Sequence, residues 1–309
     1  MRLVILSLCM VVWLASPVRA QEQFELDLEK LEQVNDWLAD EMDGGILAAL
    51  GVDEVRVRQF LAELQKRMQG TQVYDLGALR PAAVQLQPLL AMFEETQPYA
   101  LWLKTHLDDF QVAERLRTEA AGRTTNKTVL PPPTPEAQRR AWVRVIEERP
   151  APVTTNRQVA ALKKIFSEER VPPQLVWVAE VESSWDARAR SPAGAAGLFQ
   201  LMPATARSLD LSVGFFRDER LHPEKSARAA ARYLRHLHGR FGDWRLALAA
   251  YNCGEGRVSG LLKKHRGRTY DDINQFLPVE TQMYVPKIEA TLRKREKMNL
   301  RDLKTVKVG

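Results

Sequence analysis

The sequence predicts a mainly α-helical protein with at most a small β element. Apolar residues recur at spacings of three and four through most of the 309 positions, which is the pattern of helices buried on one face. The alternation of apolar and polar residues that is typical of half-buried strands is almost absent. Breaks rich in glycine or proline divide the chain into a leader, a helical module, a linker and a second helical domain.

Residues 1–20 have the composition of a secretory signal peptide. Arg2 precedes an apolar stretch over residues 3–14, and Val18 and Ala20 offer small side chains at the positions that a signal peptidase reads. The stretch is short for a membrane span. Cys9 follows Leu8, whereas a lipoprotein signal would place a small residue there. We therefore expect export and release into the periplasm, without a lipid anchor.

Residues 21–121 form the expected N-terminal helical module. Its first helix covers residues 24–42 and ends at two glycines, and further helices are expected over about 46–68, 79–93 and 99–119. The last of these has an aromatic stripe, which we interpret as core rather than as a sugar platform (Tyr99, Trp102 and Phe110).

Residues 122–155 are the expected linker, first polar and then proline-rich, as in a semi-stiff spacer. Within it, Thr134 and Pro135 are suited to the N-cap and first position of a short helix. Residues 156–309 form the second domain and end in a basic tail. There a helix ends near Arg170, and two prolines open the helix that carries Glu182.

Charge differs between the two halves of the chain. Residues 21–149 have 15 lysines and arginines against 22 acidic residues, whereas residues 150–309 have 28 against 17. The basic half suits an anionic polymer or is a solvated face, and the acidic module is a candidate for docking a protein partner. No nucleic-acid motif is present in this exported chain, so nucleic acid is not expected as a partner. After removal of the leader only Cys253 remains, which precludes an internal disulfide.

The stretch VESSWDARARSPAGAAGLFQLMP begins at residue 181 and carries the most informative carboxylate. Glu182 follows an apolar run, and burial among apolar groups keeps a carboxylic acid protonated near neutral pH, as a general acid requires. Gly194 and Gly197 in the following loop let the backbone approach a bulky ligand, and Gln200 can donate to and accept from sugar groups. Taken alone, the loop also fits a tight structural turn with a buried glutamine.

Two later motifs, and the absence of a metal-binding motif, help to decide which chemistry Glu182 could serve. Residues 249–258 run from a helix end into a glycine-rich turn, AAYNCGEGRV, and residues 280–287 read ETQMYVPK. His236 and His238 are two apart on an expected helix and therefore diverge, and HExxH is absent. We expect no metal and no other cofactor.

In their order these motifs resemble the lytic transglycosylases of bacterial peptidoglycan that have an Slt-type catalytic domain. The matching series is ES-x-W, S-x-x-G-A-x-G-L-F-Q-L-M-P, A-Y-N-x-G-x-G-R-V and E-T-x-x-Y-V, and it covers roughly residues 171–293. The sequence is most similar to the membrane-bound D branch, without visible LysM repeats. The resemblance implies a lysozyme-like helical catalytic domain and peptidoglycan strands as the substrate.

The resemblance also implies roles for particular residues. Glu182 corresponds to the sole catalytic acid and base, and Tyr284 to the tyrosine that orients it. The remaining expected substrate-binding positions line or shape the cleft (Ser191, Gly197, Phe199, Gln200, Tyr251 and Asn252). Cys253 stands where the family usually has alanine, and we interpret it as a packing residue.

A single carboxylate is sufficient if the substrate supplies its own nucleophile. Glu182 would protonate the bridging oxygen between N-acetylmuramic acid and N-acetylglucosamine, and would then accept the proton of the 6-hydroxyl as a 1,6-anhydro ring closes. Asp186, Glu255 and Glu280 have weaker claims as a second carboxylate. Two alternatives stay open, a goose-type lysozyme-like hydrolase and a peptidoglycan-binding or scaffold protein.

Overall fold

The computed structural model describes residues 54–304, except residues 93, 95, 123–129, 153 and 155. The expected signal peptide and the first expected helix of the module lie outside the described residues. No helix in the described part is both long and apolar enough to cross a membrane.

The described chain is helical, which confirms the predicted fold class. Its α-helices are α3 (Glu54–Gln69), α4 (Val73–Leu76), α5 (Arg80–Leu90), α6 (Gln97–Ala121), α7 (Pro135–Glu148), α8 (Asn156–Glu168), α9 (Val178–Ser183), α10 (Pro203–Ser208), α11 (Pro223–Phe241), α12 (Trp244–Cys253), α13 (Glu255–His265), α14 (Tyr270–Ile273) and α15 (Val279–Glu296). Short 3-10 turns are η1 (Gly77–Leu79), η2 (Pro173–Trp177), η3 (Glu219–Leu221), η4 (Asn274–Phe276) and η5 (Leu300–Asp302). Between residues 54 and 304, β structure consists of isolated bridges in the loops around residues 190–201 and 213–218.

Local sequence signals account for several helix ends. The Thr134 side chain accepts a hydrogen bond from the Ala137 amide at 3.2 Å, with Pro135 in the first helical position, so α7 begins where the sequence predicts. Asp243 caps α12 in the same way, through the Leu246 amide at 2.9 Å. Gly242, which ends α11, has a φ of 67°, a left-handed conformation that glycine adopts without strain.

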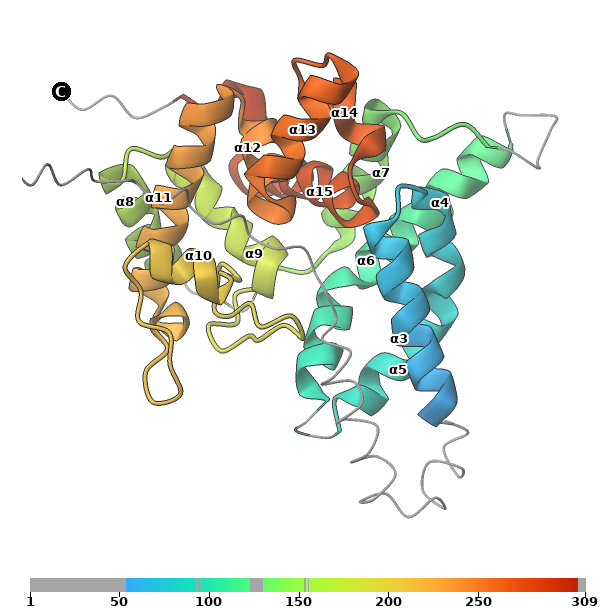
Figure 1. The fold of residues 1–309 in the computed structure, drawn as a ribbon, viewed down its shortest axis with the longest axis horizontal. Helices are drawn as coiled ribbons and strands as arrows, with labels where there is room; N and C mark the ends of the chain where they lie inside the picture. Colours follow the sequence, from blue (N-terminus) through green and yellow to red (C-terminus); the bar gives the residue numbers. More distant parts are fainter. Residues whose placement is uncertain are drawn as a thin grey trace, which may run out of the picture.

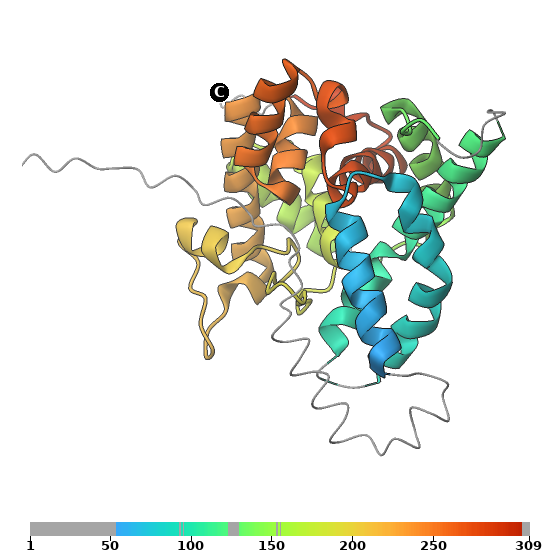
Figure 2. The ribbon, with the colours of Figure 1, turned by 45° about the vertical axis from the view of Figure 1, so that its right-hand side comes forward.

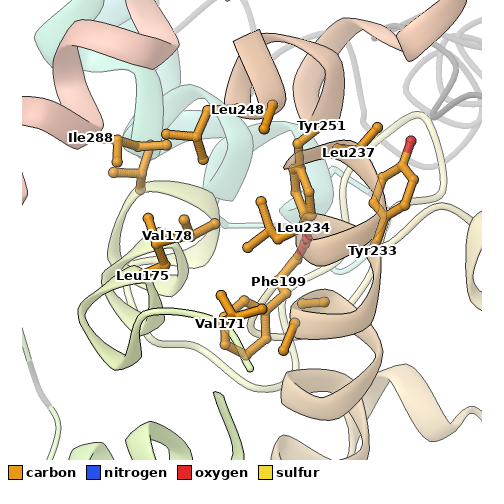
Figure 3. Packing of buried hydrophobic residues seen from close by; sticks show 14 of the residues in the cluster. Val171, Leu175, Val178, Phe199, Tyr233, Leu234, Leu237, Leu248, Tyr251 and Ile288 are labelled. Carbon is orange, nitrogen blue, oxygen red and sulfur yellow. The ribbon is translucent and has the colours of Figure 1, made fainter. Parts of the chain in front are cut away.

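The buried side chains form two hydrophobic cores. The first core comprises residues from α8 to η5, and Figure 3 shows Phe199 and Tyr251 directed into it beside Leu234. The second core comprises α3 to α7 together with three residues of α15, namely Val279, Met283 and Ala290. In Figures 1 and 2, α15 lies between the helices of the two cores. Helix α15 therefore packs against both cores, and α6 also contacts α9.

Helix α7 is the short helix expected within the linker, and it is packed rather than exposed. Trp142 and Ile146 are fully buried, and α7 lies against both α6 and α15. These contacts make α7 part of the second core. The division of the chain at residues 121 and 155 stays a prediction.

Candidate active site

Glu182 lies in the last turn of α9, a short helix surrounded by the first core. Val178 and Ala179 are fully buried, whereas Glu182 is half-buried and lines a cavity. The helix ends at Ser184, which has a φ of 52°. Glu180, two residues before Glu182, points elsewhere and accepts two 2.9 Å hydrogen bonds from Arg295. The two carboxylates therefore do not form a pair.

The cavity beside Glu182 measures about 70 Å³ and draws its walls from both cores. Five of the eight site residues expected from the sequence line it: Glu182, Ser191, Gln200, Asn252 and Tyr284. The other lining residues are Trp102, His106 and Asp109 from α6, Glu280 and Lys287 from α15, and Val181, Ala193, Ala195 and Met202. Segments far apart in the sequence thus meet at one carboxyl group.

Gly197, Phe199 and Tyr251 do not line this cavity. The rings of Phe199 and Tyr251 are fully buried in the first core, where Phe199 packs against Phe166 at a centroid distance of 5.6 Å. Tyr251 Oη donates a hydrogen bond to the Phe199 carbonyl at 2.7 Å. These two residues support the loop that carries Gln200, and the expectation that they contact substrate stays untested.

The pKa of Glu182 is raised to about 8, chiefly because burial disfavours its charged form, with a further upward contribution from the charge of Glu280. Tyr284 and Lys287 act in the opposite direction. Tyr284 Oη donates a hydrogen bond to Glu182 Oε1 at 2.5 Å. The carboxyl group is therefore mostly protonated at neutral pH and is held by one oxygen.

The loop between α9 and α10 is fixed by hydrogen bonds and by one required glycine. Gly197 has a φ of 79°, and a Cβ atom there would lie 1.9 Å from the Arg220 carbonyl oxygen. The buried guanidinium of Arg220 donates to the carbonyls of Gly194 and Leu201 at 2.7 and 2.9 Å. Gln200 Nε2 donates to the Gly197 carbonyl at 2.8 Å, which holds the amide on the cavity wall.

Glu280 also lines this cavity, although its sequence context indicates only weakly that it could act as a second carboxylate. Burial raises its pKa to about 7. It accepts a hydrogen bond from Asn252 Nδ2 at 3.3 Å, while Thr281 Oγ1 donates to Asn252 Oδ1 at 2.6 Å. A signal was available, because Glu280 and Tyr284 are four apart on one helix and therefore share a face.

The sequence motifs do not identify the three residues of α6 that line the cavity. Trp102, His106 and Asp109 lie on one face of α6. From the sequence, Trp102 is expected to be a core residue. Trp102 is in fact 8% exposed and lies at the boundary between core and cavity. The three residues are four and three positions apart, which indicates a shared helix face, but the same spacing fits an ordinary buried face.

The described residues contain no group of three or more histidine, cysteine, aspartate or glutamate side chains that could hold a metal ion. His236 lies 3.2 Å from Glu255. Cys253 is buried, and burial raises its thiol pKa to about 12, so the thiol stays protonated.

One segment of this chain is similar to known proteins. Residues 161–274 match the model described as "Transglycosylase SLT domain". The chain is 42% identical over 123 residues to "Membrane-bound lytic murein transglycosylase D" of Escherichia coli (strain K12), covering 39% of this chain and 27% of the relative. It is 38% identical over 96 residues to "Soluble lytic murein transglycosylase" of Salmonella typhimurium, covering 29% of this chain and 15% of the relative.

The matched segment thus spans about a quarter or less of these relatives' own lengths. Among solved structures, the 70 kDa soluble lytic transglycosylase of Escherichia coli aligns with a TM-score of 0.43 at 21% identity. That alignment covers 89% of this chain and 50% of the other.

Proposed function

We propose that this chain, which carries a transglycosylase SLT domain at residues 161–274, is a lytic transglycosylase that cleaves the glycan strands of peptidoglycan. The observation that carries the proposal is the carboxyl group of Glu182, which lies in a cavity, accepts a hydrogen bond from Tyr284 and has a pKa of about 8. A proton donor of this kind suits the cleavage of a glycosidic bond near neutral pH. The similarity to relatives named as lytic murein transglycosylases supports the same substrate.

In the proposed reaction, protonated Glu182 donates its proton to the oxygen that bridges N-acetylmuramic acid C1 and N-acetylglucosamine C4. The C1–O bond breaks, and the sugar leaves with a free 4-hydroxyl. The Glu182 carboxylate then accepts the proton of the muramic acid 6-hydroxyl as O6 bonds to C1. The proton returns to Glu182, no water is consumed, and a 1,6-anhydro ring is formed.

Tyr284 holds Glu182 Oε1 through both steps, which leaves Oε2 to carry the transferred proton. The phenol is itself buried, which raises its pKa well above its ordinary value, so Tyr284 stays a donor. The tyrosine therefore orients the acid without competing for the proton.

One observation favours a second candidate, a goose-type lysozyme-like hydrolase. Glu280 lines the same cavity, and a carboxylate there could activate a water molecule, as in two-carboxylate glycosidases. Its hydrogen bond from Asn252 already occupies Glu280 Oε1, which favours a structural role over that of a base.

Mass spectrometry of digested sacculi tests the proposal. Products with 1,6-anhydro ends are expected from the wild type and none from Glu182→Gln, which has nearly the same shape and no acidic proton. Products heavier by one water would overturn the transglycosylase and favour the hydrolase.

A protein of the cell envelope that only binds or scaffolds peptidoglycan is the remaining alternative. It would be favoured if Glu182→Gln abolished lysis and still complemented a deletion strain. We further propose export to the periplasm, which the apolar leader supports, and which cell fractionation tests.

A further inference from the structure

We propose that Trp102, His106 and Asp109, here called the α6 wall, form a binding subsite for an N-acetylglucosamine-type sugar directly beside Glu182. All three side chains line the cavity that contains Glu182, yet they lie outside the segment that matches the transglycosylase family. The inference rests on the proposed function for its substrate class. It assigns substrate recognition to the N-terminal helices.

Two rings of the wall lie face to face, so each covers one face of the other and the wall offers a ligand the outer face of one ring. Trp102 and His106 are stacked with a centroid distance of 4.1 Å and an interplanar angle of 22°. Aromatic surfaces of this kind pack against the apolar C–H faces of ring-shaped ligands, while a few polar groups fix the orientation.

His106 supplies a hydrogen-bond acceptor. Its Nδ1 atom lies 2.8 Å from the Trp102 carbonyl oxygen, and since a carbonyl only accepts, Nδ1 carries the proton. Burial lowers the pKa of His106 to about 4, so the ring is neutral and Nε2 has a lone pair. Asp109 Oδ2 lies 3.9 Å from Nε2, beyond hydrogen-bond distance. Nε2 can therefore accept from a hydroxyl or an amide of a ligand.

Asp109 and Lys287 fix the wall relative to Glu182. Lys287 Nζ donates to Asp109 Oδ1 at 3.0 Å and to the Thr105 carbonyl at 2.7 Å, and both charged side chains are under 5% exposed. Lys287 is one turn beyond Tyr284 on α15. The helix that orients Glu182 thus also positions α6, and a surface formed before binding loses little entropy when the ligand arrives.

The chemistry of the wall selects one occupant. Nε2 of His106 accepts only, and Lys287, the one lysine or arginine among the described residues that line the cavity, is already paired with Asp109. Such a surface suits a neutral sugar rich in hydroxyl and N–H donors. It does not suit a stem peptide, whose carboxylates would need an unpaired cation. N-acetylglucosamine has the required donors, and its oligomers are soluble probes.

The test measures binding of an N-acetylglucosamine tetramer to the Glu182→Gln variant by isothermal titration calorimetry. Adding His106→Phe keeps a stacked ring and removes the acceptor, so the dissociation constant should rise about three- to tenfold. His106→Gln, which places an oxygen near Nε2, should recover part of the loss. The matched control is His238→Phe, because His238 stacks on Trp244 at 4.0 Å outside this cavity.

Unchanged binding in His106→Phe, with unfolding midpoints equal to the parent, would overturn the subsite, as would an equal loss in His238→Phe. In the active enzyme, His106→Phe should raise KM and leave kcat nearly unchanged, because the interaction forms in the ground state and persists. Failure of the proposed function is distinguishable: sacculi would then yield no anhydro products, while the tetramer would still bind in a His106-dependent way.

Discussion

Tyr284 and Glu182 are 102 positions apart in the sequence, and the Tyr284 hydroxyl donates to Glu182 Oε1 at 2.5 Å. This bond connects α15 to α9 at the cavity. It lowers the pKa of a carboxyl group that burial otherwise raises, so one contact affects both the position and the acidity of the proposed proton donor.

Tyr284→Phe removes this bond and keeps the ring. We expect kcat to fall roughly 10- to 100-fold because the acid loses its orientation. Since the bond lowers the pKa of Glu182, the pKa should rise further, and the alkaline limb of the rate profile should move to higher pH. A pH series of initial rates on sacculi checks both effects. An unchanged limb would show that the bond does not exist in solution.

Glu280→Gln distinguishes the two candidate mechanisms. The charge of Glu280 raises the pKa of Glu182, so its removal should shift the alkaline limb to lower pH while activity persists. Rates measured across the same pH series, together with product masses, check this. Loss of all cleavage in a folded Glu280→Gln protein would instead support a second catalytic carboxylate.

The raised pKa of Glu182 also links stability to pH. The group has a pKa of about 8 when folded and an ordinary pKa of 4.5 when unfolded, so the native state holds the proton more tightly. Its contribution to stability is complete below about pH 4.5 and is lost as pH rises through about 8. Glu182→Gln should therefore lose less stability than the wild type over that window. Thermal unfolding midpoints of both proteins, measured from about pH 4.5 to pH 8, check the difference. Midpoints that fall equally in both proteins would contradict the prediction.

Replacing only one member of the buried Lys287–Asp109 ion pair should lower the stability of the fold. Lys287→Met leaves a buried carboxylate without its partner, and we expect unfolding free energy to fall by about 3–5 kcal/mol. The double variant Lys287→Met with Asp109→Leu should recover much of that loss. Urea unfolding of the three proteins provides the comparison, and a double variant as unstable as the single one would contradict the interpretation.

Gly197→Ala should strongly destabilise the loop that carries Gln200. The new Cβ atom would overlap the Arg220 carbonyl oxygen, and the φ of 79° adds strain, for a loss of about 3 kcal/mol or more. Gly194→Ala is the matched control, because its φ is 87° and its Cβ would meet nothing within 4 Å. That variant should lose only about 1 kcal/mol. Equal losses in the two variants would show that strain alone, and not the overlap, matters.

The part of the site that could be predicted is the part carried by local motifs. Glu182 follows an apolar run and Tyr284 lies in a short motif, so both could be identified from neighbours in sequence. Trp102 could not, because its spacing fits a buried helix face equally well, and only the packing of α6 against α9 brings it to the cavity.

Burial was equally hard to predict for residues within the motifs. Phe199 and Tyr251 belong to the same motifs as Gln200 and Asn252, yet their rings are fully buried in the first core. A sequence motif indicates that its residues are needed together. It does not distinguish residues that contact a ligand from residues that support the contacting ones.

The segment that matches the transglycosylase family ends at residue 274, before α15 begins at Val279. If residues 161–274 were transplanted alone into another protein, Glu182 would lose the tyrosine that holds it. Extending the graft through α15 would restore Tyr284 but uncover Val279, Met283 and Ala290, which the N-terminal helices bury. The smallest transferable unit that keeps this site intact is therefore much larger than the matched segment, and it reaches back to α3.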